Sequence, residues 1–252
     1  MDWDVAAYEA FRTHRERPFL DLMARVPDGA RSVLDAGCGT GRTTRSLAAR
    51  FPGAEVLGVD ASRGMLAQAP SVQGVRFEQA DLVAWRPARR FDLVVANAVL
   101  HWLPDPEATL CRFASFVAPG GTLAVQVPAN FEAPSHRAVR ALAAEPAWAG
   151  ATRVAAGDHV LALEGYASVL EDEGCKVEAW ETTYRMRLPG DDAVLRWLEG
   201  TTLRPFQAAL GPRFEAFRAA LARRLREAYP PDARGTVFPF TRRFAVATSS
   251  RR

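Results

Sequence analysis

The clearest chemical content in the sequence is an acid followed by three alternating glycines, Asp35-Ala36-Gly37-Cys38-Gly39-Thr40-Gly41. Alternating glycines exclude regular structure and let the backbone take positive φ angles and approach a ligand without a Cβ atom in the way. Apolar residues compatible with a β-strand precede the acid, and a helical pattern follows over residues 42–50. The segment therefore joins the carboxyl end of a strand to a helix N-terminus, where open α/β sheets bind ligands.

The glycine spacing distinguishes between two kinds of ligand. A dinucleotide fingerprint has the pattern Gly-x-Gly-x-x-Gly, in which the helix N-terminus holds a pyrophosphate, whereas this loop has Gly-x-Gly-x-Gly. The Asp35 carboxylate would repel a pyrophosphate but would suit an ammonium group. The loop therefore favours a ligand with a cationic amino-acid moiety and no phosphates, a description that S-adenosylmethionine fits. A tight strand–helix turn without a ligand is the structural alternative.

Two further acids follow predicted strands. Asp60 ends the strand that begins near Ala54 and stands 19 residues beyond Gly41, a spacing at which an acid can accept both ribose hydroxyls. Asp81 and Leu82 follow the strand 75–80 and are placed for the adenine amino group and ring edge. Strand, glycine loop and acids in this order predict a nucleoside-binding sheet.

Polar and aromatic residues follow the fourth predicted strand, residues 91–96, at the switch point of the sheet. Asn97 comes first. His101 is either a structural histidine, a hydrogen-bonding pocket residue or, only for a hydroxyl acceptor, a base. Trp102 either contacts a cationic sulfonium through its ring or packs on the following helix. Ser62 is expected to cap a short helix, with Ala61 and Met65 on the cofactor side.

Strands and helices alternate up to residue 127, which predicts an α/β protein with a doubly wound, mostly parallel seven-stranded sheet and a helical cap. The last strand, 236–246, should pair antiparallel with strand 175–188. Pro18 should break or restart the first helix. The expected segments are an N-terminal helical lid (1–30), an S-adenosylmethionine-binding α/β core (31–127), a helical cap insertion (128–158), a core helix and strand (159–188), a second helical cap insertion (189–233), and the last core strand with the tail (234–252).

Composition narrows the class of protein. The 252 residues are 48% hydrophobic, enough for a full core. The net charge is +3, but the basic residues are scattered and nearly balanced by 29 acids, which disfavours a nucleic-acid partner. No long apolar run or apolar signal core occurs, and three widely spaced cysteines disfavour a zinc site. We expect a cytoplasmic protein, monomeric or weakly dimeric, without a metal, nucleic-acid or membrane partner.

The residues described above, Asp35 to Gly41, Asp60 and Asp81, together with the strand order, resemble class I S-adenosylmethionine-dependent methyltransferases. More specific runs are similar to the trans-aconitate 2-methyltransferase family: Trp3, Tyr8 and Phe11, residues 96–105, 182–184 and 201–206, and the tail around 238–240. The resemblance gives Asp35, Gly37 and Gly39 to the methionine end, Asp60 to the ribose, Asp81 and Leu82 to the adenine, and Asn97 to the neighbourhood of the sulfonium. It implies a small tricarboxylic acid as acceptor, methylated on one carboxylate.

The resemblance also suggests residues for a small anionic substrate. Arg204 is the preferred anchor, because an arginine fork holds a carboxylate in a fixed geometry. The other candidates are Trp3, Tyr8, His101, Trp102 and Arg185, with Arg187 and Arg153 weaker. Three features depart from the family pattern: Thr202 replaces a glycine, His101 replaces a common glutamine, and Arg185 and Arg187 add charge. The acid that is methylated can differ accordingly.

The implied chemistry requires no acid or base, because a carboxylate is already ionised at neutral pH. His101 and Trp102 are candidates for positioning only. Two alternatives stay open. One is a methyltransferase for another acceptor, such as a natural-product hydroxyl or an acyl-carrier-bound acid. The other is a nucleotide-binding protein that is not a methyltransferase, either an oxidoreductase or a non-enzyme.

Overall fold

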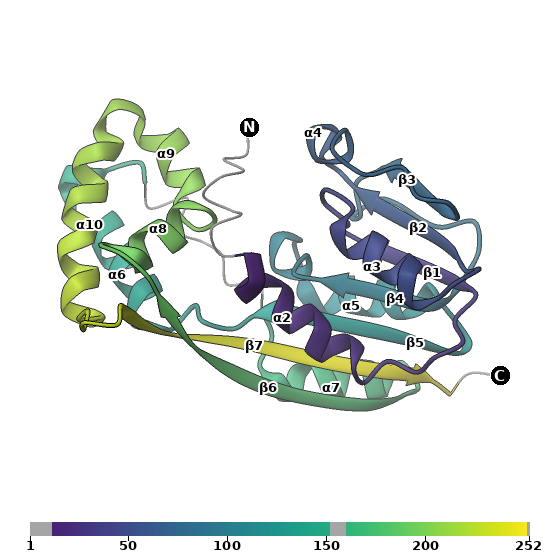
Figure 1. Cartoon of the computed structure of the whole chain (residues 1–252). Coiled ribbons are helices and arrows are strands. Elements are labelled where there is room, and N and C mark those ends of the chain that lie inside the picture. Colours follow the sequence, from purple (N-terminus) through teal and green to yellow (C-terminus); the bar gives the residue numbers. More distant parts are fainter. Residues whose placement is uncertain (1–11, 152–159, 251–252) are drawn as a thin grey trace. The chain divides into compact units, whose positions relative to one another are not determined.

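The structure, a computed structural model, describes residues 12–151 and 160–250 (Figure 1). These residues form two compact units, each with its own core. The sheet unit comprises residues 17–128, 160–182 and 242–250, and the helical unit comprises residues 12–16, 129–151 and 183–241. No helix in these ranges is long and apolar enough to cross a bilayer.

Seven strands form one sheet in the order β3-β2-β1-β4-β5-β7-β6, which confirms the predicted fold class. The strands from β3 to β5 in this order pair in parallel, and β7 pairs antiparallel with β5. The strand bounds are β1 Ser32–Ala36, β2 Glu55–Asp60, β3 Val75–Gln79, β4 Phe91–Asn97, β5 Val117–Pro128, β6 Cys175–Leu188 and β7 Thr236–Ser249.

The pairing of β6 with β7 follows from their side chains. The Thr183 and Thr241 hydroxyls are 2.9 Å apart, and Arg243 Nε donates to Glu181 at 3.0 Å. In these two pairs the residue number falls along β6 as it rises along β7, so the two strands are antiparallel, as the sequence predicts.

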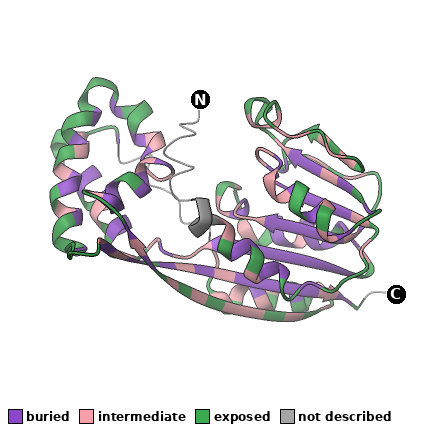
Figure 2. Cartoon of the chain, in the orientation of Figure 1, coloured by how far each residue is buried: buried purple, intermediate pink, exposed green. Residues whose placement is uncertain are grey.

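The middle of the sheet is apolar on both faces because helices cover parallel sheets. Leu34, Val94 and Leu123 are completely buried, and Figure 2 shows the central strands as mostly buried. The elements joining the strands are α3 (Arg42–Arg50), α4 (Arg63–Leu66), the 3-10 turn η1 (Leu100–Trp102), α5 (Pro106–Ser115) and α7 (Leu163–Asp172).

Local sequence signals set the ends of these helices. Asp105 caps α5 by accepting the Ala108 N–H at 3.0 Å, and Pro106 occupies the first turn, where no N–H is needed. Gly174 follows α7 with φ at +77°, the left-handed conformation expected at a helix end. Strand β6 then begins at Cys175, as the sequence predicts.

The expectation that Pro18 interrupts the first helix is wrong. Helix α2 runs from Arg12 to Met23 with Pro18 inside it. Proline removes one backbone hydrogen bond from a helix. Burial of Phe19, Leu22 and Met23 offsets that loss, since all three side chains lie in the apolar interior of the sheet unit.

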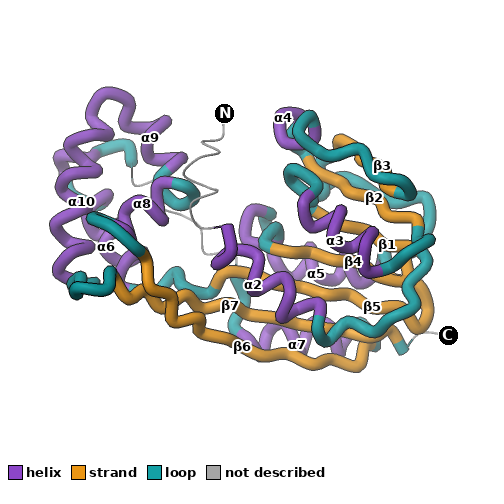
Figure 3. Tube along the Cα trace, in the orientation of Figure 1, coloured by secondary structure: helices purple, strands orange, loops and turns teal. Residues whose placement is uncertain are grey.

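Helices dominate the helical unit, which Figure 3 shows together with the ends of β6 and β7. Its elements are α6 (Pro134–Ala143), η2 (Pro146–Trp148), α8 (Ala193–Glu199), α9 (Arg204–Leu210), η4 (Gly211–Arg213) and α10 (Phe214–Ala228). Phe214, Phe217, Leu221 and Leu225 recur at helical spacing in the sequence, which predicts an apolar stripe, and all four are buried on α10. This unit therefore has an apolar core of its own.

Phe217 is central to that core, with its ring stacked on Phe206 and edge-on to Trp148 at centroid distances of 5.5 and 5.3 Å. Replacing it by alanine should cost about 3–5 kcal/mol through lost burial and a residual cavity. Urea unfolding of the full chain measures the loss. Arg223→Ala, an exposed change on the same helix, should stay within about 0.5 kcal/mol of the unsubstituted protein. Equal losses from both substitutions would contradict this assignment of the core.

Candidate active site

The loop after β1 folds back onto the end of β2. The Gly37 and Cys38 amides donate to the Val59 carbonyl at 2.8 and 3.1 Å. The Asp60 carboxylate accepts the Gly39 amide through Oδ2 and the Ser62 amide through Oδ1, both at 2.8 Å. Each carboxylate oxygen has more than one acceptor position, so Asp60 keeps capacity for two hydroxyl groups. The loop and the predicted ribose acid therefore belong to one site.

The three glycines of the loop have different roles, although all three have positive φ angles. A Cβ atom on Gly37 would lie 2.3 Å from a Val99 methyl, and one on Gly41 would lie 2.6 Å from the Phe77 ring. Close packing thus requires glycine at these two positions. A Cβ atom on Gly39 would meet only the Met65 sulfur, at 3.6 Å. Of the three, Gly39 is the position where the backbone is open to a ligand.

Asp35 is almost completely buried at the end of β1. Its Oδ2 accepts the hydroxyls of Thr43 and Thr44 at 2.9 and 2.7 Å, so two residues of α3 hold the carboxylate. Burial raises the pKa of Asp35 to about 6 against the lowering effect of the hydroxyls, and the nearby charge of Asp60 adds to the rise. The structure brings the two acids together, and an ammonium contact by Asp35 stays a prediction.

The adenine candidates flank the end of β3. Leu82 is buried in the core of the sheet unit, whereas Asp81 is exposed and accepts the Val83 amide at 2.9 Å. Ser62 caps α4 as expected by accepting the Met65 amide at 3.3 Å. Ala61 is exposed and Met65 half-buried. The adenine contacts of Asp81 and Leu82 stay a prediction.

The end of β4 and the turn that follows it carry a half-buried amide, an imidazole and an exposed indole. Asn97 Oδ1 accepts the Gln126 side-chain amide at 2.6 Å. Burial, aided by the charge of Arg242, lowers the pKa of His101 to about 3. The Trp102 ring lies 4.9 Å from the His101 ring and is 62% exposed, so the ring itself is not buried, although the turn η1 that carries it contacts α5.

Gln126 and Arg242 are absent from the residues that the sequence predicts for the site. Both are buried on neighbouring strands, and Arg242 Nη1 donates to Gln126 Oε1 at 2.9 Å. The available signal was a polar residue inside an apolar strand, Val125-Gln126-Val127. A buried polar side chain needs a partner. Its partner on β7 cannot be identified from local pattern.

The remaining substrate candidates lie in the helical unit or outside the described residues. Arg204 begins α9 and is half-buried, and Arg185 is exposed on β6. Arg187 pairs with Asp232 at 2.5 Å, which commits its charge to a structural contact. Trp3, Tyr8 and Arg153 lie outside the described residues. Thr202, at the departure from the family pattern, places its hydroxyl 3.4 Å from His136 Nε2.

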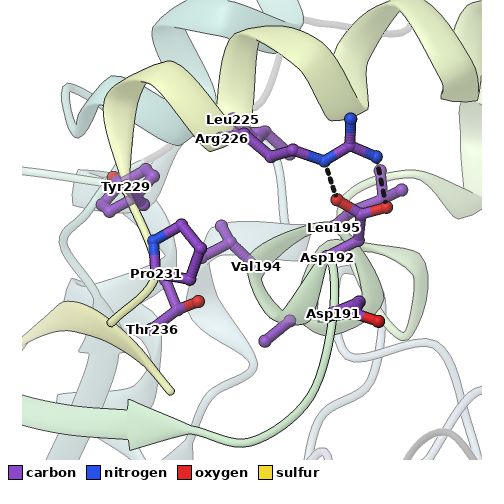
Figure 4. Close-up of a pocket in the computed structure, with 10 residues that line it drawn as sticks. Asp191, Asp192, Val194, Leu195, Leu225, Arg226, Tyr229, Pro231 and Thr236 are labelled. Carbon is purple, nitrogen blue, oxygen red and sulfur yellow. Dashed lines mark hydrogen bonds and ion pairs between the residues drawn. The ribbon is translucent and has the colours of Figure 1, made fainter. Parts of the chain in front are cut away.

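Two cavities in the described part of the helical unit are lined by other residues than the predicted site residues. One, of about 390 Å³, lies between the start of α8 and the end of α10 (Figure 4). The Asp192 carboxylate and the Arg226 guanidinium form a two-bonded ion pair at its edge, at 2.6 and 2.8 Å. A second, of about 600 Å³, is lined by Asn130 and Tyr229. Across residues 12–151 and 160–250, no cluster of three metal-binding side chains occurs.

Comparison with known proteins identifies the family. A family model described as a methyltransferase domain matches residues 8–180. The trans-aconitate 2-methyltransferase of Streptomyces avermitilis is 46% identical over 97% of this chain and 96% of its own. The chain belongs to the trans-aconitate 2-methyltransferase family. Membership explains the joint presence of the glycine loop, Asp60 and the polar residues after β4.

Solved structures support the fold of the family. The [4+2]-cyclase SpnF covers 98% of this chain and 86% of its own at a TM-score of 0.61 and 16% identity. A Haemonchus contortus phosphoethanolamine N-methyltransferase 2, solved with phosphomonomethylethanolamine and S-adenosylhomocysteine, covers 95% of this chain and 53% of its own at a TM-score of 0.57 and 16% identity. One of these folds belongs to a cyclase, so function must be argued from the site.

The pKa of Asp35 predicts how stability depends on pH. Folding raises this pKa from 3.8 to about 6, so the folded state holds the proton more tightly and the contribution of Asp35 to stability decreases as pH rises from about 4 to 6. The neutral Asp35→Asn variant should lack this decrease. Its free energy of unfolding relative to the unsubstituted protein should rise by about 3 kcal/mol between pH 4 and pH 7. Urea unfolding at both pH values measures the difference, and a constant difference contradicts the assignment.

Proposed function

We propose that this protein transfers the methyl group of S-adenosylmethionine to one carboxylate of trans-aconitate, which yields a methyl ester. The family is a methyltransferase family, and its curated relatives at about 46% identity are named for this acid. The cofactor is S-adenosylmethionine. The residues fit it, because Gly39 leaves room beside Met65 and Asp60 retains acceptor capacity.

The single observation that carries the choice of acceptor is the likeness of nearly the whole chain to relatives named for trans-aconitate. The site agrees with it, because burial lowers the pKa of His101 to about 3, and such an imidazole is a weak base toward a hydroxyl group at neutral pH. A carboxylate needs no such base, since its reference pKa is near 4. The residues after β4 therefore suit an acid acceptor better than a natural-product hydroxyl.

The remaining task of the protein is to bind, orient and exclude water. When bound, S-adenosylmethionine supplies a methyl group activated by a positively charged sulfur. Asp60 and the Gly39 backbone hold the donor side, and the Asn97 side chain and the His101 and Trp102 rings border the acceptor side. Holding reacting atoms in line is worth about 7–11 kcal/mol in favourable cases. Removal of water from two opposite charges strengthens their attraction further.

Charge supports an anionic acceptor. The positive charge of Arg242 acts at His101, where it lowers the imidazole pKa, so it raises the potential around that ring. A polycarboxylate is attracted to such a region. We propose Arg204 at the start of α9 as the fork for a carboxylate that does not react. Arg185, Trp3 and Tyr8 remain secondary proposals.

We also propose that the protein acts in the cytoplasm on a small anionic substrate, as a monomer or weak dimer without a nucleic-acid partner. Basic residues are scattered along the sequence, and many pair with acids, as Arg226 does with Asp192. Such pairing leaves little charge for a phosphate backbone.

The acceptor is tested with a panel of small acids and hydroxyl compounds, using S-adenosylmethionine and mass spectrometry of the products. Trans-aconitate should gain one methyl group as a base-labile ester. Saturated and shorter acids in the panel should react more slowly. A base-stable methyl ether on a hydroxyl compound, with trans-aconitate unmodified, would contradict the proposal.

The ribose role predicts a graded loss at Asp60. Asp60→Ala removes the acceptor of the Gly39 and Ser62 amides together with the hydroxyl contacts, and should raise the dissociation constant of S-adenosylhomocysteine by about 10–100-fold, as loss of charged hydrogen bonds does. Asp60→Asn keeps one acceptor oxygen, so its dissociation constant should lie between those of the unsubstituted protein and Asp60→Ala. Calorimetric titration measures both, with the exposed Asp172→Ala as a charge-matched control. Unchanged affinity in Asp60→Ala removes this residue from the ribose role.

A further inference from the structure

A chain of side-chain hydrogen bonds, buried at Arg242 and Gln126 and partly buried at Asn97, runs through three neighbouring strands of the sheet unit. Arg242 on β7 donates to Gln126 on β5 at 2.9 Å, and Gln126 donates to Asn97 on β4 at 2.6 Å. Gln126 and Asn97 are register partners, and the strands β4, β5 and β7 are adjacent (Figure 1). The chain ends at the switch point of the sheet, beside the glycine loop.

Donor and acceptor chemistry fixes the direction of this chain. A guanidinium has only donors, so Gln126 must turn its Oε1 toward Arg242. Its Nε2, which can only donate, then faces Asn97, and Asn97 must answer with its only acceptor, Oδ1. The Nδ2 group of Asn97 is consequently directed away from Gln126. Arg242 therefore determines, through Gln126, that Nδ2 is the end of the Asn97 amide left for a ligand.

The backbone supports the same arrangement. Ala98, which follows Asn97, has φ at +56°, a left-handed conformation that is costly for a residue with a Cβ atom. Its amide donates to the Gln126 carbonyl at 2.8 Å. Gln126 thus holds the turn through its backbone and the Asn97 amide through its side chain. Gln126 is only 2% exposed, so its own polar groups are shielded from water and depend on these partners.

We infer that Gln126 and Arg242 are positioning residues that hold Asn97 as a hydrogen-bond donor to the acceptor carboxylate. This rests on the proposed function, since a donor at the switch point suits an anion. The inference also specifies which atom of Asn97 faces the carboxylate: the donor Nδ2, and not the acceptor Oδ1. A donated bond holds one carboxylate oxygen in place without taking its negative charge away.

Asn97 itself gives the first test. Asn97→Asp keeps an acceptor for Gln126 but turns a carboxylate oxygen toward the substrate, whereas Asn97→Ala only removes the donor. The acceptor kcat/KM should fall by about 10-fold in Asn97→Ala and by at least about 100-fold in Asn97→Asp. The dissociation constant of S-adenosylhomocysteine should stay within about 3-fold in Asn97→Ala. Activity of Asn97→Asp closer to the unsubstituted protein than that of Asn97→Ala would overturn the inference.

A double-mutant cycle tests Gln126. In Gln126→Glu the carboxylate faces Arg242 and offers Asn97 no donor, so the Asn97 amide should reverse and the acceptor kcat/KM should fall by about 10–100-fold. In the Asn97→Ala background the same substitution should change kcat/KM by less than about 3-fold. An equal fall in both backgrounds would make Gln126 merely structural. Arg242→Met should resemble Gln126→Glu, while Arg243→Met, the same charge change one residue along, should leave the acceptor KM unchanged.

Hydrogen exchange separates this inference from the proposed function and does not depend on turnover or on a variant. With side-chain amides labelled with ¹⁵N, the Gln126 Nε2 protons should exchange slowly and the Asn97 Nδ2 protons fast. The reverse order overturns the inference even if the protein forms the ester. Failure of the unsubstituted protein to methylate any acid overturns the proposed function and leaves this test of polarity intact.

Discussion

The site depends on the Asp60 carboxylate, whose two oxygens hold the Gly39 and Ser62 amides at the end of β2. One bond fixes the loop that follows β1, and the other fixes the start of α4, which carries Met65. Without this acid the two segments have no common anchor at the edge of the sheet. Charged hydrogen bonds of this kind are about twice as strong as neutral ones, so the loop is held in shape before any ligand arrives.

Opposite charges occupy opposite sides of the switch point. Asp35 and Asp60 lie on the β1–β2 side, close enough for the charge of Asp60 to raise the pKa of Asp35. Arg242 lies on the β5–β7 side, and its charge helps to lower the pKa of His101. A cationic donor and an anionic acceptor are therefore each drawn to a different side of β4. Asn97, between the two sides, is neutral and is held by a partly buried chain of bonds.

Much of the sheet unit could be predicted, because its signals are local. The alternation of elements, the glycine loop, Asp60 and the Ser62 cap are each visible within a few residues of sequence. Contacts between distant residues could not be predicted. Gly37 must be glycine because Val99 packs on it, and Gly41 because of Phe77. For the same reason the sequence could not predict the hydrogen bond between Gln126 and Arg242 or the ion pair of Arg187 with Asp232. The ion pair makes Arg187 a weaker candidate for a substrate anchor.

The site works through charge and position and transfers no proton. The decisive measurement is the pH dependence of a single turnover, with trans-aconitate and S-adenosylmethionine both saturating. With His101 neutral throughout, the rate of methyl transfer should change by less than about 2-fold between pH 6.5 and pH 9. A rate that rises about 10-fold per pH unit to a plateau would reveal an ionising base and contradict the claim.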